Sequence, residues 1–151
     1  MLLKGIIIGI IVFISLYITI VWISFLYLYE KKPVEIKKYP SITITIPAYN
    51  EEKAIEKTIM TALELNYPKD KLNIIVVDDG STDDTKKIVL NLSKKHNFTF
   101  ISKENGGKAK AMNTALKDCK TELFACLEAD SYVESDSLRR MIHHFDNPNV
   151  A

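Results

Sequence analysis

The sequence has almost no excess charge of either sign. Lysine and arginine number 20, against 19 aspartates and glutamates, which leaves a formal net charge of +1 over 151 residues. A chain this close to neutrality lacks the basic surface that attracts phosphate backbones, so nucleic acid is not an expected partner. The length corresponds to about one domain.

Cysteine and histidine are also scarce. Cys119 and Cys126 lie near each other in the sequence without the spacing of a metal site, and both are predicted to be structural thiols in a reducing, cytoplasmic environment. His143 and His144 are adjacent on a predicted helix and cannot share one face, and His96 stands alone. None of these residues is a predicted site residue.

Charge is missing altogether from residues 5–29. This apolar run is longer than the roughly 20 residues needed to cross a bilayer. A secretory signal has a shorter apolar region and a small-residue cleavage site. The run therefore predicts a transmembrane signal-anchor helix within residues 1–30, with a removed signal peptide or a very apolar core helix as alternatives.

The charges on either side of the apolar run predict its orientation. The N-terminal side carries Lys4 and the amino terminus, whereas the C-terminal side carries four lysines, at Lys31, Lys32, Lys37 and Lys38. Because positive charge favours the cytoplasmic side, the rest of the chain is expected in the cytoplasm. The predicted protein is thus a single-pass protein of the cell membrane.

The remaining sequence alternates between strand and helix patterns. Residues 31–40 carry charges and two prolines and are predicted to be a linker, and residues 41–151 form the predicted domain. Short β-branched or apolar runs predict strands, and apolar residues at helical spacing predict helices. The predicted strands are 41–46, ended by Pro47, 73–77, 98–102 and 122–127, and the predicted helices are 51–65, 83–95, 106–119 and 136–145.

This alternation indicates an α/β fold with a mainly parallel sheet of about four strands. The apolar stripes of the helices should face the sheet. The expected inward residues are Ile55, Ile59, Ala62 and Leu63, then Ile88, Val89 and Leu92, then Ala111, Met112, Ala115 and Leu116, and finally Leu138, Met141, Ile142 and Phe145.

A polar cluster follows each predicted strand. The clusters are residues 47–52, 78–84, 103–108 and 128–130. In parallel sheets ligands bind at the carboxyl ends of the strands, so all four clusters should meet at one edge. This convergence favours a binding site over four unrelated surface turns.

Two of the clusters contain groups suited to a nucleoside. Asp78 and Asp79 can accept hydrogen bonds from a base or a ribose hydroxyl, although both could serve only a turn and a helix cap. Tyr49 can stack on a flat base, although it could equally be a packed surface residue.

The other two clusters contain groups suited to a diphosphate. Lys108 follows Gly106 and Gly107 at a predicted helix N-terminus, a favourable place for a phosphate, although the full phosphate-loop pattern is absent. Glu128 and Asp130 are two carboxylates one residue apart, which could hold Mg²⁺ or Mn²⁺ on a diphosphate or could be a solvated pair.

The segments "PAYNEE", "VVDDGSTDDT", "ENGGKAKAMNTAL" and "LEAD" occur in this order and resemble the N-terminal half of family 2 glycosyltransferases. That family includes hyaluronan, cellulose, chitin and poly-N-acetylglucosamine synthases. The resemblance covers about residues 41–146 and implies a Rossmann-like nucleotide-diphospho-sugar-binding fold of the GT-A type. The preceding apolar helix resembles the membrane-embedded members.

The resemblance also implies roles for individual residues. Tyr49 would pack on the base, Asp79 would hydrogen-bond it with Asp78 nearby, and Pro47 and Glu51 would help form the nucleotide pocket. Lys108 would face the diphosphate. Asp130 would bind the metal, with Glu128 in the first place of the family's Asp-x-Asp motif, where it departs from the usual aspartate.

The implied function is metal-assisted, inverting transfer of a hexose or N-acetylhexosamine to a glycan or lipid acceptor. The donor would be a nucleotide-diphospho-sugar, with a UDP-sugar expected first, and the metal would be Mg²⁺ or Mn²⁺. The family's catalytic base is expected beyond Ala151. The alternatives are a non-catalytic nucleotide-sugar-binding membrane subunit, completed by a separately encoded acceptor half, and a truncated inactive remnant.

Overall fold

The computed structural model describes residues 2–28 and 38–146 of the chain. The chain divides into two compact units, Met1–Pro33 and Val34–Ala151, which we describe separately. Most of the predicted linker, residues 31–40, lies outside the described residues. So do three of the four lysines on which the predicted orientation depends, Lys31, Lys32 and Lys37.

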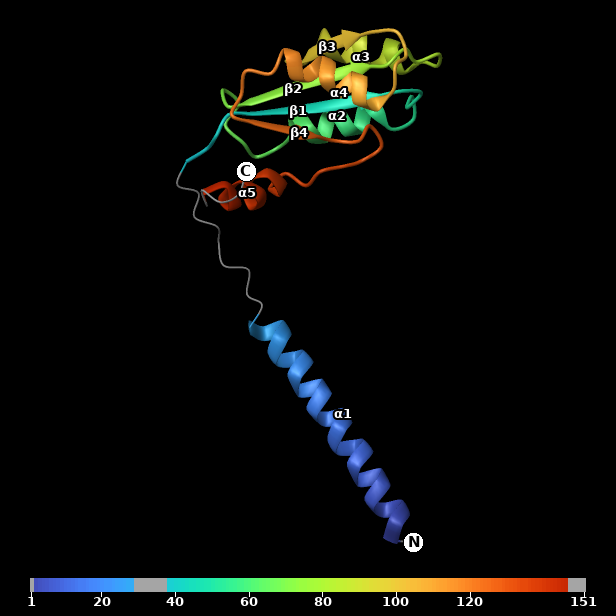
Figure 1. Cartoon of the computed structure of the whole chain (residues 1–151), viewed down its shortest axis with the longest axis vertical. Helices are drawn as coiled ribbons and strands as arrows, with labels where there is room; N and C mark the ends of the chain where they lie inside the picture. The colour runs from blue at the N-terminus through green and yellow to red at the C-terminus, as the bar shows by residue number, and fades with distance from the viewer. Residues whose placement is uncertain (1, 29–37, 147–151) are drawn as a thin grey trace. The chain divides into compact units, whose positions relative to one another are not determined.

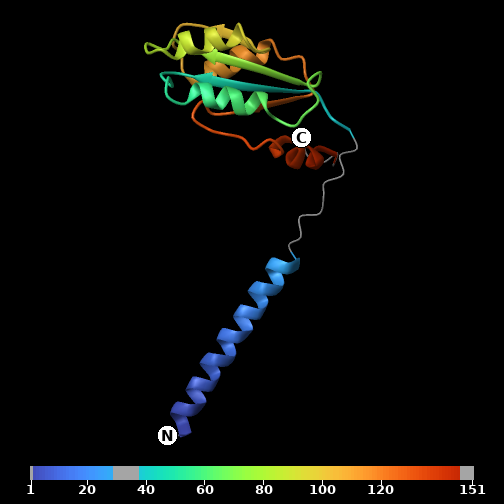
Figure 2. The ribbon, with the colours of Figure 1, turned by 180° about the vertical axis from the view of Figure 1, so that it is seen from behind.

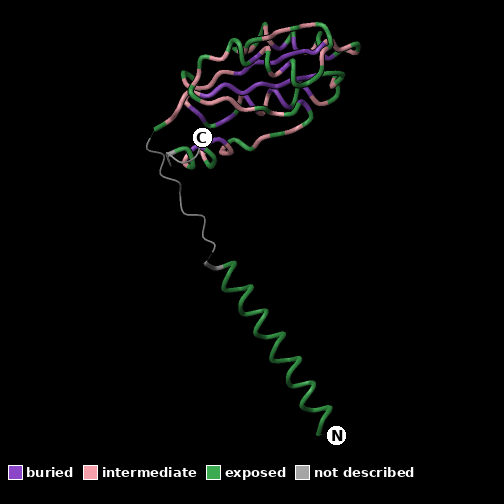
Figure 3. The backbone as a smooth tube through the Cα atoms, in the orientation of Figure 1, coloured by how far each residue is buried: buried purple, intermediate pink, exposed green. Residues whose placement is uncertain are grey.

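The first unit contains one long helix, α1 (Leu2–Leu28). Its segment Leu2–Leu26 is long and apolar enough to cross a membrane, and none of it is buried within the protein (Figure 3). At about 1.5 Å per residue, the helix would measure about 40 Å, against a bilayer hydrocarbon core of about 30 Å. The helix therefore meets the length and composition that the apolar run predicted.

The second unit is built on one parallel sheet (Figure 1). Its strands follow the order β3-β2-β1-β4, and every pairing is parallel. The strands are β1 (Ile42–Ala48), β2 (Leu72–Asp78), β3 (Thr99–Ser102) and β4 (Leu123–Cys126). This arrangement confirms the predicted α/β fold with four parallel strands.

Four helices and one short 3₁₀ helix surround the sheet. They are α2 (Ile55–Leu63), α3 (Thr85–Ser93), α4 (Lys108–Lys117), α5 (Ser137–Ile142) and the 3₁₀ helix His143–Asp146. The helices lie on both faces, and the two opposite views show α4 in front of the sheet in Figure 1 and α2 in front of it in Figure 2.

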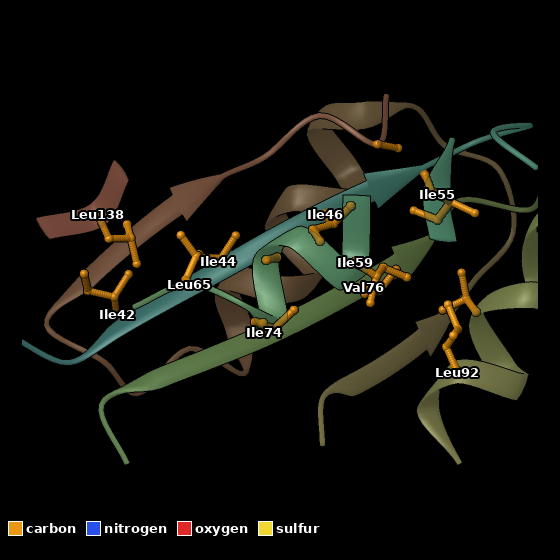
Figure 4. Close-up of a cluster of buried hydrophobic side chains, with 14 of the residues drawn as sticks. Ile42, Ile44, Ile46, Ile55, Ile59, Leu65, Ile74, Val76, Leu92 and Leu138 are labelled. Atoms are coloured by element: carbon orange, nitrogen blue, oxygen red, sulfur yellow. The ribbon is translucent and has the colours of Figure 1, made fainter. Parts of the chain in front are cut away.

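The apolar core explains this layering. One cluster joins the Ile42, Ile44 and Ile46 side of β1 to side chains of α2, α3 and α5 (Figure 4). A second, smaller cluster joins Ile75 and Val77 of β2 to Ala111 and Ala115 of α4. Both faces of the central strands are covered, and this is why even Thr43 and Thr45 in β1 are fully buried.

The predicted start of the first domain helix at residue 51 is wrong. Residues 51–54 form a turn, in which the backbone N–H groups of Ala54 and Ile55 both donate to the Glu51 carbonyl, and α2 begins only at Ile55. The N–H groups of Glu51 and Glu52 are instead bound by side chains of a distant loop. These bonds hold Glu51 and Glu52 in the turn that precedes α2.

The prediction that Pro47 ends the first strand is also wrong, since β1 continues to Ala48 with Pro47 opposite Val77. Backbone groups alternate sides along a strand, and the Ala48 carbonyl accepts a hydrogen bond from Asp79 in the β2 direction. The Pro47 nitrogen therefore faces β4. Pairing with β4 ends two residues earlier, at Thr45, so the missing N–H leaves no ladder bond unmade.

Three residues expected to face the core are exposed. Leu116 of α4, Met141 of α5 and Phe145 of the 3₁₀ helix are 51%, 56% and 42% exposed. On α4 only the small residues Ala111 and Ala115 are buried, four positions apart on one narrow stripe. The six-residue α5 likewise buries one i, i+4 pair, Leu138 and Ile142.

The strand order identifies the functional edge of the sheet. The chain moves outward from β1 to β2 to β3, then returns to the other side of β1 to form β4, and α4, which carries this return, lies on the opposite face. The direction of winding thus reverses between β1 and β4. In open α/β sheets ligands bind at the carboxyl ends of the strands at such a reversal.

Candidate functional site

A cavity of about 200 Å³ opens at the reversal point between β1 and β4. It contains seven of the eight predicted site residues, all except Asp78. The lining residues are Pro47, Ala48, Tyr49, Glu51, Asp79, Lys108, Glu128, Ala129 and Asp130. Residues up to 83 positions apart in the sequence therefore meet in one place, as the strand-end clusters predicted.

Tyr49 presents an aromatic surface at this cavity. It follows the last residue of β1 and is 48% exposed. An exposed ring beside a polar cavity is suited to stacking against a planar ligand. Glu51, two residues further, brings a carboxylate to the same cavity.

Asp79 lies at the bottom of the site and is 3% exposed. Its carboxylate accepts hydrogen bonds from the N–H groups of Gly107, at 2.6 Å, and Gly106, at 3.1 Å, and from the Lys103 ammonium. Burial alone would raise the pKa of Asp79, but these donors outweigh burial and hold it below its ordinary value. Asp79 is therefore a charged residue that organises the glycine loop before α4.

Asp78 lies away from the cavity. It is fully buried and accepts hydrogen bonds from the Ser81 N–H and the Ser102 hydroxyl, each at 3.1 Å, which joins the end of β2 to its own turn and to β3. It also borders a second, more open hollow of about 470 Å³. The sequence left open whether Asp78 binds a nucleoside or only stabilises a turn, and these contacts favour the turn.

The hydroxyl and acidic residues after Asp79 hold the β1 loop in place. The Asn50 N–H donates to the Ser81 hydroxyl at 3.0 Å, and the Asn50 side-chain carbonyl accepts the Thr82 N–H at 2.8 Å. Asn50 has a φ of 56°, a left-handed conformation that asparagine tolerates better than most residues. These bonds connect the β1 and β2 loops.

The hydrogen bonds between the β1 and β2 loops continue through the next residues. The Glu51 N–H donates to the Thr85 hydroxyl at 2.8 Å, and the Glu52 N–H donates to the Asp83 carboxylate at 3.2 Å. Asp83 also accepts the Thr85 N–H at 3.0 Å. Burial would raise the pKa of Asp83, but the hydrogen bonds from Thr85 and Glu52 lower it overall. Most polar residues of "GSTDDT" are thus structural and position the loop that carries Tyr49 and Glu51.

Gly80 is required at the turn between these loops. Its φ is +75°, and a Cβ atom there would lie 2.6 Å from the backbone nitrogen of Asn105. The β2 loop consequently packs directly against the segment that leads to α4. Any side chain at Gly80 would push these two loops apart.

Lys108 and Glu128 form an ion pair across the cavity. Lys108 is the first residue of α4, after Gly107 with a φ of +85°, and its ammonium contacts the Glu128 carboxylate. The hydrogen bond that Lys108 donates to Glu128 raises the pKa of Lys108, so the ammonium stays charged. Both side chains are about half exposed, which leaves them free to exchange this contact for a ligand.

Glu128 and Asp130 are exposed on either side of the buried Ala129. Among residues 2–28 and 38–146, no group of three or more histidine, cysteine, aspartate or glutamate side chains could hold a metal ion. Mg²⁺ is commonly held by only one or two carboxylates together with substrate phosphates. The two carboxylates beside the Lys108 ammonium fit this kind of metal binding.

Sequence reasoning missed several residues that build the site. Lys103 was placed in a polar cluster without a role, and Thr58 was not singled out although its hydroxyl donates to the Ala129 carbonyl at 2.7 Å. Ala48 and Ala129 line the cavity with small apolar side chains. A threonine on the buried stripe of α2 that bonds the "LEAD" segment from 71 positions away in the sequence has no local signal.

The comparisons with known proteins agree with this geometry. The family model "Glycosyl transferase family 2" matches residues 43–151. The chain is 35% identical over 121 residues to poly-beta-1,6-N-acetyl-D-glucosamine synthase of Staphylococcus aureus (strain COL), covering 79% of this chain and 29% of that protein. The chain thus spans less than a third of the length of this curated relative.

Solved structures give the same result. The mannosyltransferase PcManGT from Pyrobaculum calidifontis, in complex with GDP-Man and Mn²⁺, has a TM-score of 0.72 and 33% identity, over 85% of this chain and 39% of that one. S. aureus TarS 1-349 in complex with UDP-GlcNAc has a TM-score of 0.63 and 30% identity, over 70% and 31%. With the matching family model and the cavity at the reversal of the sheet, these similarities show that the chain belongs to glycosyl transferase family 2.

Proposed function

We propose that this chain is the donor-binding part of a membrane-anchored glycosyltransferase that uses a nucleotide-diphospho-sugar. The observation that carries the proposal is the meeting of Tyr49, Asp79, Lys108 and the Glu128–Asp130 turn around one cavity. A nucleoside diphosphate needs an aromatic or polar base site, a cation for the phosphates and oxygen ligands for a metal. The cavity offers all three.

The donor would lie across the ends of β1, β2 and β4. Tyr49 would stack on the base, while Glu51 and the wall at Pro47 would confine the nucleoside. Lys108 would turn from Glu128 to the diphosphate, assisted by the N-terminus of α4. The solved relatives with GDP-Man and UDP-GlcNAc support a nucleoside diphosphate donor, and we expect a UDP-sugar carrying a hexose or N-acetylhexosamine.

The proposed metal is Mg²⁺ or Mn²⁺, held by Asp130 and Glu128. When bound, the ion would neutralise negative charge that develops on the departing diphosphate. Release of Glu128 from Lys108 would free the Glu128 carboxylate to bind the metal. The same exchange would free the Lys108 ammonium to bind the diphosphate. The longer glutamate side chain keeps the carboxylate that the family motif supplies with aspartate.

Transfer to the acceptor is proposed for the whole protein, because the chain spans only 29% of the curated relative's length. We expect inversion at the anomeric carbon, a glycan or lipid acceptor, and a domain on the cytoplasmic side of the membrane. We assign none of the cavity residues as the base that removes the acceptor's proton. A nucleotide-sugar-binding subunit that acts with a separately encoded acceptor half is therefore the second candidate.

Calorimetric titration of the full chain in lipid nanodiscs would test donor binding. UDP with Mn²⁺ should bind at least tenfold more tightly than UMP with Mn²⁺, because UMP lacks the second phosphate for Lys108 and the metal. Equal affinity for the two nucleotides, or no binding of UDP and GDP, would contradict the proposal. Turnover of UDP-GlcNAc or GDP-Man by the chain alone would favour the enzyme over the binding subunit.

A further inference from the structure

A buried hydroxyl of helix α2 donates a hydrogen bond to the turn that carries Glu128 and Asp130. Thr58 is fully buried, and its hydroxyl lies 2.7 Å from the Ala129 carbonyl oxygen. The same hydroxyl lies 3.2 Å from the Ala54 carbonyl of its own helix, so the contact to Ala129 is the shorter one. A threonine in a helix usually bonds only locally, and this one connects two distant segments.

Ala129 is the point at which this turn is attached to the domain. The turn is closed by the Ser131 N–H, which donates to the Glu128 carbonyl at 3.1 Å. The Ala129 side chain is 5% exposed and belongs to the main apolar core, whereas its neighbours Glu128 and Asp130 are exposed. A displacement of Ala129 would therefore move both carboxylates together.

We propose that Thr58 is a positioning residue for the metal-binding carboxylates Glu128 and Asp130, acting through the Ala129 carbonyl. The proposal rests on the proposed function, which places a divalent metal at these carboxylates. Thr58 does not line the cavity, so it would act without touching donor or metal. Residues that orient metal ligands from behind typically change metal affinity by about 10- to 100-fold when they are removed.

Thr61 provides a matched control on the same helix. Its hydroxyl donates to the Thr58 carbonyl at 3.0 Å, which is a local bond within α2. The substitutions Thr58→Val and Thr61→Val each replace a hydroxyl by a methyl group in one helix. Only Thr58→Val removes the donor to Ala129.

The test is a titration of Mn²⁺ into the full chain in lipid nanodiscs with saturating UDP, followed by the electron paramagnetic resonance signal of free Mn²⁺. Thr58→Val should weaken Mn²⁺ binding about tenfold. Thr61→Val should stay within twofold of the unmodified chain, and Thr58→Ser, which keeps the hydroxyl, should stay within threefold. Circular dichroism would establish that each variant is folded.

Binding of Mn²⁺ by Thr58→Val within twofold of the unmodified chain would overturn the inference and leave the proposed function intact. Failure of the unmodified chain to bind Mn²⁺ with UDP or GDP would overturn both. If Thr58→Val does not fold, Thr58→Ala and Thr58→Ser form the deciding pair. Equal Mn²⁺ affinities for these two variants would then overturn the inference, and an affinity several times weaker for Thr58→Ala would support it.

Discussion

The Asp79 carboxylate accepts the backbone N–H of Gly107 at 2.6 Å, although 28 residues separate them in the chain. Asp79 is the first residue after β2, and Gly107 directly precedes α4. This contact holds the end of β2 against the N-terminus of the helix that carries Lys108. The geometry of the site therefore depends on a buried charge.

Replacement of Asp79 by asparagine should destabilise the domain by about 2 kcal/mol, because hydrogen bonds to a charged group in a buried position are lost or weakened. It should also weaken UDP binding, since the Gly106–Gly107 loop would lose its acceptor. Thermal unfolding of the full chain and a UDP titration would measure the two effects. Asp118→Asn, at an exposed position after α4, should change neither.

The stabilisation by Asp79 should depend on pH in a defined direction. Its pKa is lower in the folded chain than in the unfolded chain, so the unfolded state binds the proton more readily. The contribution is therefore complete above the unfolded value of about 4 and is lost as the pH falls through the folded value. The difference in unfolding free energy between the unmodified chain and Asp79→Asn should be constant from pH 7 to 5 and should shrink below pH 4. A difference that grows on acidification would contradict this assignment.

Replacement of Lys108 by glutamine should weaken UDP binding at least tenfold and leave thermal stability unchanged. The ammonium faces the cavity and its ion pair with Glu128 is exposed, so the charge matters to a diphosphate more than to folding. Titrations with UDP and UMP would separate the phosphate contribution. Lys117→Gln, at the other end of α4, is the control, and equal losses for both lysines would indicate a general charge effect.

Asn50 combines an unusual backbone conformation with a structural side chain. Asn50→Ala should lower the free energy of unfolding by about 2 kcal/mol, since it removes the acceptor for Thr82 and leaves a φ of 56° to alanine, which tolerates it less well than asparagine does. Asn50→Gly loses the same hydrogen bonds but tolerates the backbone, so it should be less destabilising. Chemical denaturation of both variants would test this order of stability. A glycine variant that is less stable than the alanine variant would contradict the prediction.

The proposed cytoplasmic orientation can be tested with Cys126, an exposed residue at the end of β4. A membrane-impermeant maleimide should label Cys126 in permeabilised cells and not in intact ones. Substitution of both Cys126 and Cys119 by serine should abolish the labelling, because the chain has two cysteines. Labelling in intact cells would place the domain on the outer side of the membrane.

Local patterns in the sequence were sufficient for the elements and the class of fold. Residues 74–77 of β2 are a continuous apolar run, as expected for a strand covered on both faces, and α1 is recognisable because its apolar run exceeds the thickness of a bilayer. The meeting of the polar clusters was also predictable, since carboxyl ends of parallel strands share one edge. These properties depend on periodicity and composition, which are local.

Which residues of each polar cluster line the cavity, and which stabilise the loops, was decided only by tertiary contacts. Asp78 and Asp79 are neighbours of identical chemistry, yet one is buried against β3 and the other binds the glycine loop beside the cavity. Residues 51–54 have a helical pattern, but side chains more than 30 positions away take the N–H groups of Glu51 and Glu52. Such hydrogen bonds join segments far apart in the chain, so they cannot be predicted from neighbouring residues.

The sequence by itself determined an apolar N-terminal helix, an alternating α/β domain and four polar strand ends. Only the tertiary structure decided that β4 returns beside β1, that the cavity lies at this reversal, and that Thr58 supports the Glu128–Asp130 turn from behind. The physical reason is that strand order and side-chain partnership are set by packing among segments far apart in the chain. Periodicity records which face of an element is buried, and it contains no information about which partner buries it.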